Sequence, residues 1–231
     1  MADENISVTA WRNNAYDESI LLELEDIMNY KVNLEQIDYY NTHKLVVNPK
    51  RAALLIIEMQ NVFRNDLNMI SDKQLTNIKT IIKASEKAGV TIIYVRHNDS
   101  TEISKSMVDW WNGDKIEYGS EGWKMIDDFD TADKIVIDKN QYSAFFQTEL
   151  HNVLQANKIE DVIIVGVMTN CCCETTAREA FMYGYRVFFI NDATSTVNEE
   201  LHLATLKNLS FGFAYIQDTQ HIVSDLNANE E

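Results

Sequence analysis

VIIVGVMTNCCCETTAREAFMYGYRVFFI, residues 162–190, combines two short apolar runs with a helical pattern between them. The runs at 162–167 and 186–190 are continuous and apolar, as expected of strands that are buried on both faces. Residues 174–184, between the runs, predict a helix. A strand, a helix and a second strand in this order favour a parallel sheet that is covered by helices.

The same alternation extends over most of the chain. Further strands are predicted at 52–57, 91–95, 134–137 and 213–216, and further helices at 75–82 with an end at Gly89, at 150–154 and at 198–208. The expected fold is an α/β domain with a doubly wound, mostly parallel sheet and helices on both faces, a Rossmann-like three-layer sandwich. Residues 97–130 lack this pattern and are predicted to form a long loop region.

The first 46 residues differ from the rest in being strongly acidic and aromatic. Apolar residues recur there at helical spacing from Ile20 to Met28, behind the possible N-cap Asp17. We therefore predict an N-terminal extension, 1–46, with a helix around 18–30, ahead of a main domain at 47–231. An amphipathic helix of this length needs a surface, either on the main domain or on a second subunit.

Composition excludes several classes of function. The chain has 231 residues and a formal net charge of −16 at pH 7, with no clustered basic segment, so nucleic acid and anionic membranes are poor partners. No apolar run approaches the ~20 residues that cross a bilayer, and the N-terminus lacks the pattern of a secretory signal. The three cysteines are contiguous at 171–173, which favours a reducing compartment over a disulfide framework. A cytoplasmic protein is expected.

Three residues with chemical potential follow predicted strands. Glu58, Lys139 and Cys172 each lie after a strand, and ligands of open α/β sheets bind beyond the carboxyl ends of the strands. Cys172 also lies at the entrance of a helix, where free N–H groups favour a thiolate. The alternative for Cys172 is a small core cysteine, which is what we expect of Cys171 and Cys173. The alternative for Glu58 and Lys139 is a structural ion pair between them.

A metal site is not expected. Contiguous cysteines cannot easily present three thiolates to one ion. The five histidines, at positions 43, 97, 151, 202 and 221, show no ligand-like spacing. His97 follows a strand and is interpreted either as a pocket residue or as a structural one.

Three segments together resemble the isochorismatase-like cysteine hydrolases. They are AALLIIEMQNVF (52–63), DKNQYSAFFQTEL (138–150) and GVMTNCCCETTAREAFMYGY (166–185), followed by NDAT (191–194) and His202. The similarity extends in the same order from about 50 to 220. This superfamily includes nicotinamidases, carbamoylsarcosine and ureidoacrylate amidases, and isochorismatases.

The resemblance implies roles for individual residues. Glu58 takes the position of the family's catalytic Asp, Lys139 that of its Lys and Cys172 that of its nucleophile. The backbone N–H groups of Cys172 and Met168 would form the oxyanion hole, after a cis peptide bond between Val167 and Met168. Candidate walls of the substrate pocket are Phe63, Trp111, Tyr118 and Tyr142. The family also implies a homo-oligomer, for which the 18–30 helix is a candidate contact.

Two departures from the family pattern matter. Glu58 keeps the carboxylate but adds a methylene, and a displacement on the ~1 Å scale can cost about 10²-fold in rate. The D-x-H metal-binding motif of nicotinamidases has no match after Phe63, so we expect no metal and no other cofactor. Isochorismatases that cleave a vinyl ether lack the nucleophilic cysteine, so Cys172 favours the C–N hydrolases.

Three hypotheses follow from these residues. The first is a metal-free cysteine amidohydrolase that acts on a small amide or ureide through a thioester on Cys172, with Glu58 as general base and Lys139 as electrostatic support. The second is a degenerate relative that binds a small ligand or partner without turnover. The third is a redox-sensing thiol protein that uses the three cysteines.

Overall fold

The computed structural model describes residues 32–67 and 69–228. The helix predicted around 18–30 lies outside these residues. The strands are β1 (Ala52–Ile57), β2 (Thr91–His97), β3 (Ile135–Lys139), β4 (Asp161–Val167), β5 (Arg186–Ser195) and β6 (Tyr215–Gln217). They form one six-stranded sheet in the order β3-β2-β1-β4-β5-β6, and every neighbouring pair is parallel. The predicted doubly wound sheet is confirmed, and the chain reverses its direction of travel between β1 and β4.

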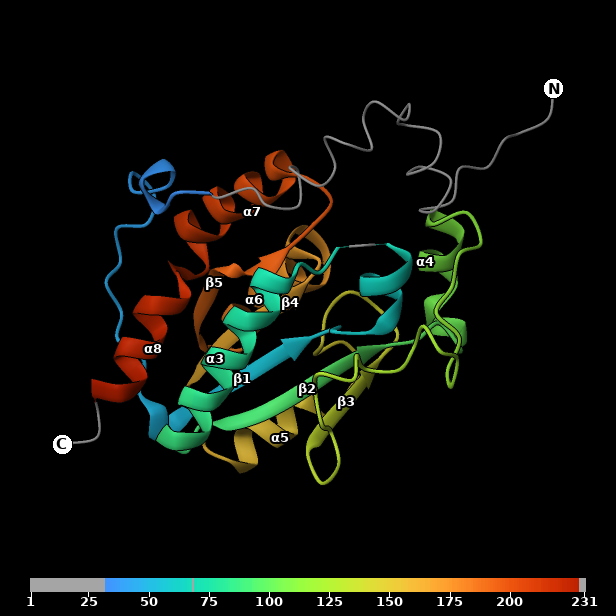
Figure 1. The fold of residues 1–231 in the computed structure, drawn as a ribbon, viewed down its shortest axis with the longest axis horizontal. Coiled ribbons are helices and arrows are strands. Elements are labelled where there is room, and N and C mark those ends of the chain that lie inside the picture. Colours follow the sequence, from blue (N-terminus) through green and yellow to red (C-terminus); the bar gives the residue numbers. More distant parts are fainter. Residues whose placement is uncertain (1–31, 68, 229–231) are drawn as a thin grey trace.

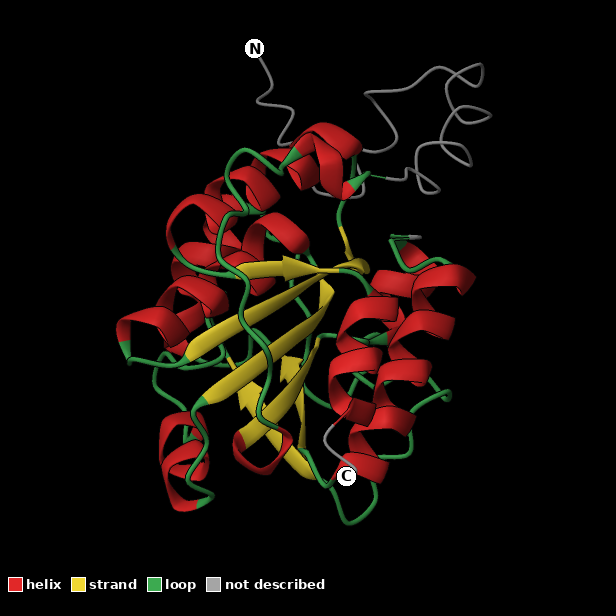
Figure 2. Ribbon diagram, turned by 90° about the vertical axis from the view of Figure 1, so that its left-hand side faces the viewer, coloured by secondary structure: helices red, strands yellow, loops and turns green. Residues whose placement is uncertain are grey.

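Helices cover both faces of this sheet (Figures 1 and 2). One face carries α3 (Asp72–Ala88) and α8 (Thr219–Asn227), and the other carries α5 (Leu150–Ala156), α6 (Glu174–Met182) and α7 (Glu199–Gly212). The short helix α4 (Lys105–Trp110) lies beyond the carboxyl ends of β1 and β2. None of the helices in the described part of the chain has the length and apolar character that crossing a bilayer demands.

The two faces are built by alternation along each strand. In β1, Leu54 and Ile56 pack with α3 and α8, while Leu55 and Ile57 pack with the helices of the opposite face. All six residues of β1 are buried. This is why the central strands appear in the sequence as continuous apolar runs rather than as alternating patterns.

The elements differ from the sequence-based expectation in three places. The stretch 97–130 is interrupted by α4, β5 continues five residues past the predicted end at Ile190, and α8 was not predicted. A turn of π-helix, Thr169–Cys173, also precedes α6. Helix α3, by contrast, ends as predicted, at Gly89 with φ +74°.

Residues 32–47 pack onto the sheet domain. Ile37 is fully buried in the core, and the Val32 carbonyl accepts a hydrogen bond from Asn191 Nδ2 at 2.9 Å. The side-chain amide of Asn41 pairs with the backbone of Ile216 in the edge strand β6, donating to its carbonyl at 2.8 Å and accepting from its N–H at 3.1 Å. These residues therefore complete one edge of the sheet.

Candidate active site

The carboxyl ends of four adjacent strands, β1 to β4, meet at one cavity. Glu58 follows β1, His97 ends β2, Lys139 ends β3 and Cys172 follows β4. The cavity has a volume of about 550 Å³, and its lining includes Glu58, His97 and Cys172. The three candidate catalytic residues of the sequence analysis are thus brought together, as expected for ligand sites at a topological switch point.

Glu58 has an unusual backbone conformation. Its φ is +51°, in the left-handed region, which costs a non-glycine residue on the order of 1 kcal/mol. Its N–H still donates to the Val95 carbonyl of β2 at 2.9 Å, so the chain leaves the sheet immediately after this bond. The turn directs a fully buried carboxylate into the cavity, and such strained residues are often found at functional sites.

Cys172 sits in the π-helical turn between β4 and α6. The cis peptide bond expected between Val167 and Met168 is present. The Met168 carbonyl accepts hydrogen bonds from the N–H groups of Cys171 and Cys173, both at 3.1 Å. Met168 and Cys172 both line the cavity, as an oxyanion hole built from their N–H groups would require.

Lys139 connects the other two side chains. Its buried ammonium forms an ion pair with Glu58, donates to the Gln141 carbonyl at 2.7 Å and lies 3.5 Å from Cys172 Sγ. Glu58, Lys139 and Cys172 are between 1% and 5% exposed. The ion pair has the geometry that a buried pair needs, with further hydrogen bonds to the ammonium.

Burial changes the protonation of these groups. Burial, and then the negative charge of Glu58, raise the pKa of the Cys172 thiol well above its ordinary value, and Lys139 opposes them. For Lys139, burial lowers the pKa, but Cys172 and Glu58 raise it by more, so the amine stays protonated. Burial and Glu58 thus favour the thiol form of Cys172, opposite to the thiolate that the position at the helix entrance favours.

His97 forms a second pair beside Lys139. Its Nε2 lies 2.8 Å from Asp99 Oδ1, and its Nδ1 lies 3.5 Å from Lys139 Nζ. The side chains of His97 and Asp99 are each 5% exposed. His97 is thus a pocket residue in contact with Lys139, and Asp99 lines the same cavity.

Gln60 holds the backbone of His97 and of Trp123 in place. Its side chain accepts the His97 N–H at 2.8 Å and donates to the carbonyls of His97 at 3.0 Å and Trp123 at 2.8 Å. The residue is fully buried. Sequence analysis missed both Gln60 and Asp99. Gln60 lies three positions past the end of β1, and its partners His97 and Trp123 are too distant in sequence for a local pattern to indicate them.

Three of the four expected wall residues line the cavity, namely Phe63, Trp111 and Tyr142. Trp111 Nε1 donates to the Tyr142 hydroxyl at 3.1 Å, and burial raises the pKa of Tyr142 to about 12. Tyr118 does not line the cavity. It is 64% exposed, and its ring packs 4.5 Å from that of Trp123, because the 97–130 segment turns this side chain outward.

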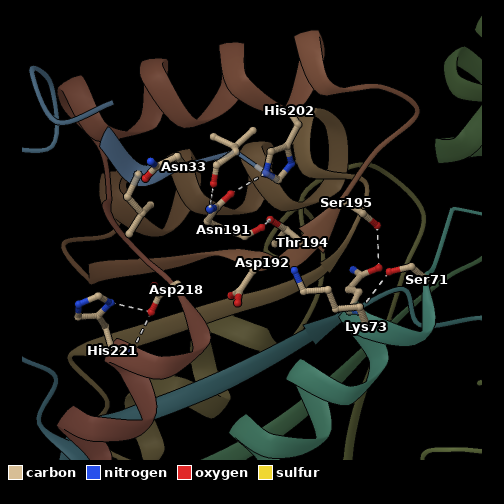
Figure 3. A pocket seen from close by; sticks show the side chains of 13 residues that line it. Asn33, Ser71, Lys73, Asn191, Asp192, Thr194, Ser195, His202, Asp218 and His221 are labelled. Carbon is tan, nitrogen blue, oxygen red and sulfur yellow. Dashed lines mark hydrogen bonds and ion pairs between the residues drawn. The ribbon is translucent and has the colours of Figure 1, made fainter. Parts of the chain in front are cut away.

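A second cavity, of about 560 Å³, lies along the second half of β5 (Figure 3). None of the described residues that line it is a cysteine or a residue of the candidate active site. His202 lies at its edge and bonds Asn191 at 2.9 Å and Thr169 at 2.9 Å, so it joins α7 to β5 and to the turn that holds Cys172. Burial lowers the pKa of His202 to about 4.

The residues present do not fit a metal ion. Within 32–67 and 69–228, no three His, Cys, Asp or Glu side chains are grouped as ligands. In the cavity, both ring nitrogens of His97 already face partners, Asp99 and Lys139. No catalytic step is therefore assigned to a metal.

Comparison with known proteins places the chain in a family. The family model "Isochorismatase domain" matches residues 52–221. The chain belongs to the isochorismatase family. The resemblance in its sequence motifs is thereby confirmed.

Two relatives of this chain are amidohydrolases. The chain is 44% identical over 194 residues to nicotinamidase 3 of Arabidopsis thaliana, covering 82% of this chain and 96% of that protein. It is 26% identical over 212 residues to the ureidoacrylate amidohydrolase RutB of Acinetobacter baylyi, covering 79% and 86%. The isochorismatase-family chain is an amidohydrolase, a hydrolase of C–N bonds other than peptide bonds.

The fold also matches solved isochorismatase-like structures. A cysteine hydrolase from Pseudomonas syringae pv. phaseolicola superimposes with a TM-score of 0.75 at 23% identity, covering 80% of this chain and 96% of that chain. At this identity the likeness concerns the fold alone.

Proposed function

We propose that this isochorismatase-family protein hydrolyses a small carboxamide to a carboxylic acid and ammonia, with Cys172 as nucleophile, Glu58 as base and Lys139 as electrostatic support. The observation that carries the proposal is the convergence of these three buried side chains at one cavity. Nicotinamide is the first substrate to test, because the 44%-identical relative is a nicotinamidase.

The first half of the reaction forms a thioester. Glu58, which is hydrogen-bonded to the Cys172 thiol, takes the thiol proton as sulfur attacks the carbonyl carbon. The N–H groups of Met168 and Cys172 stabilise the oxyanion of the tetrahedral intermediate. As the C–N bond breaks, the nitrogen takes the proton back from Glu58 and leaves as ammonia.

The second half uses water. Glu58 takes a proton from a water molecule, whose oxygen attacks the thioester carbon. The C–S bond then breaks, the acid is released, and the sulfur regains its proton from Glu58. Throughout both halves Lys139 stays charged and faces whichever anion is present, the Glu58 carboxylate or the Cys172 thiolate.

The charges of the cavity favour an uncharged substrate. Besides the Glu58–Lys139 pair, the lining holds the carboxylates of Asp66, Asp99 and Asp114, and one further cation, Lys115, which pairs with Glu117 at 2.8 Å. A substrate that carries its own carboxylate, such as ureidoacrylate, would enter an acidic cavity without an arginine in its lining. We therefore expect kcat/KM for nicotinamide to exceed that for ureidoacrylate by at least about tenfold.

The test is hydrolysis by wild type, Cys172→Ala and the neighbouring control Cys171→Ala. Released ammonia should appear with wild type and with Cys171→Ala, and Cys172→Ala should lose at least about 10³-fold in kcat while keeping the thermal unfolding midpoint. Mass spectrometry of acid-quenched enzyme should detect an acyl adduct on Cys172, and addition of EDTA should leave the rate unchanged.

Three outcomes would contradict the proposal. Retained turnover in Cys172→Ala would exclude the nucleophile. Inactivation by EDTA, reversed by a divalent cation, would exclude a metal-free site. Saturable binding of nicotinamide without ammonia release would instead favour the alternative of a binding protein without turnover.

A further inference from the structure

The Lys139 ammonium has more acceptors around it than protons to donate. An ammonium carries three N–H donors. Two of them are used by the Glu58 carboxylate and the Gln141 carbonyl. The third faces two acceptors at the same distance, 3.5 Å to Cys172 Sγ and 3.5 Å to His97 Nδ1. Because Lys139 is 1% exposed, water does not serve as an alternative acceptor.

Asp99 determines which nitrogen of His97 accepts. Both oxygens of this carboxylate are engaged, Oδ1 with His97 Nε2 at 2.8 Å and Oδ2 with the Ile116 N–H at 2.9 Å. A carboxylate only accepts, so Nε2 must carry the ring proton. Nδ1 is then left with a lone pair that faces Lys139. Gln60 fixes the His97 backbone through two hydrogen bonds, and the contact with Asp99 orients the ring.

We propose that His97 and Asp99 keep the resting Cys172 in its thiol form by offering the third N–H of Lys139 an acceptor other than sulfur. A neutral thiol is a weak acceptor and imidazole nitrogen a stronger one, so at rest the N–H points to His97. When Glu58 removes the thiol proton, the sulfur becomes an anion, and the N–H turns to it. His97 and Asp99 are thus positioning residues that act through Lys139. The inference rests on the proposed role of Cys172.

Other groups around the Cys172 thiol also raise or lower its pKa. Glu58 from the end of β1 and Cys171 from the same turn raise the pKa of the thiol, as burial does, and Lys139 from the end of β3 lowers it. Tyr142 faces it across the cavity as a neutral phenol. Lys139 is the one cation among these facing groups. The pKa of the thiol therefore depends on whether the third N–H of Lys139 points to the sulfur or to His97.

A matched pair of variants isolates the acceptor. Leucine and asparagine have nearly the same size and shape, but His97→Asn retains an oxygen acceptor two bonds from Cβ, where Nδ1 lies, and His97→Leu has none. Both variants remove the bond to Asp99, so this loss cancels in the comparison. Alkylation by iodoacetamide, followed at Cys172 by tandem mass spectrometry from pH 6 to 10, measures thiolate formation without requiring turnover.

Loss of the competing acceptor should promote the thiolate. Below the pKa of the thiol the alkylation rate follows the thiolate fraction, so we expect His97→Leu to react about fivefold faster than His97→Asn at pH 7, with a rate profile displaced to lower pH. A residue that merely supported the fold would leave this pair equal or would slow the reaction. Equal rates, or a slower His97→Leu, would overturn the inference.

Asp99→Asn provides a second route that keeps the imidazole. Its amide oxygen is needed by the Ile116 N–H, so its NH₂ faces His97 Nε2 and forces the ring proton onto Nδ1. Lys139 then loses the competing acceptor, and alkylation should rise as in His97→Leu. If His97→Leu fails to fold, this variant decides the question, and an unchanged rate excludes the inference.

The outcome is separable from that of the proposed function. Turnover by Cys172→Ala would remove the nucleophile and with it the proposed function. Equal alkylation of the His97 pair, together with inactive Cys172→Ala, would remove only the role of His97 and Asp99.

Discussion

At the scale of single residues, the site is fitted to glutamate at position 58. The left-handed backbone at Glu58 turns the side chain toward Lys139, and the carboxylate reaches the ammonium and the Cys172 thiol together. A shorter acid at the same Cα would stop about one C–C bond short of both partners. The extra methylene relative to the family pattern is therefore part of the geometry of this site.

Glu58→Asp should accordingly lower activity. We expect kcat for the amide to fall about 10²-fold with little change in KM, because the base is displaced by ~1 Å from the thiol proton. Steady-state kinetics would measure this, with Glu200→Asp as the control, an exposed glutamate of α7 whose shortening should have no effect. A gain in kcat would mean that the native base is detuned and would favour the binding-protein alternative.

Sequence analysis located the three candidate catalytic residues but not their supports. Glu58, Lys139 and Cys172 each follow an apolar strand, and strand ends can be recognised in sequence. Gln60 and Asp99 act through backbone groups of His97, Trp123 and Ile116 that are distant in sequence, so no local pattern indicates them. The pKa of Cys172 likewise depends on burial, which the position at a helix entrance does not reveal.

At the scale of elements, the junction of β1 and β4 positions Glu58 and Cys172. Gly166 has φ +120°, and a Cβ at this position would lie 2.0 Å from the Ile57 carbonyl oxygen. Ile57 and Gly166 are paired across the two strands, directly before Glu58 and the cis peptide bond. A residue without a side chain is therefore what allows the ends of β1 and β4 to approach each other at the candidate site.

Gly166→Ala should damage both the fold and the site. We expect the free energy of unfolding to drop by about 3 kcal/mol, because backbone rather than a flexible side chain must move. Urea denaturation would measure it, and kcat should fall in the remaining folded protein. Gly212→Ala is the matched control, since a Cβ there meets nothing within 4 Å. Equal stability of the two variants would contradict this account of Gly166.

The boundaries of elements were predictable only where local chemistry determines them. Gly89 ends α3 because a left-handed residue is needed there, and this was evident in the sequence. The extension of β5 to Ser195 depends on pairing of Thr194 and Ser195 with β4, after a register shift, which is a property of the neighbouring strand. Helix α4 has six residues, too few for a periodic pattern to be recognised.

At the scale of the whole molecule, buried His202 connects protonation to global stability. Its pKa is about 4 in the folded protein and about 6.5 in the unfolded chain, so between these values the unfolded chain binds more protons. Stability from this group is complete above pH 6.5 and is lost as the pH falls toward 4.

This dependence can be measured against a variant. Between pH 6.5 and 5, the free energy of unfolding of wild type should fall by about 1.5 kcal/mol more than that of His202→Gln. Urea denaturation at both pH values checks this, with His221→Gln as the control, since its side chain is 64% exposed. A fall of equal size in wild type and His202→Gln would show that another group is responsible.

The Asn41 side chain has a consequence for how this molecule behaves among its copies. An edge strand presents unpaired N–H and C=O groups that a strand from another chain can join, which is how sheets extend into aggregates. At β6, the outermost strand, one primary amide imitates the peptide group of a further strand and occupies the donor and acceptor of Ile216. Within residues 32–67 and 69–228 the sheet thus ends on a side chain rather than on a further strand, and at Ile216 the edge offers no free backbone pair for another chain to join.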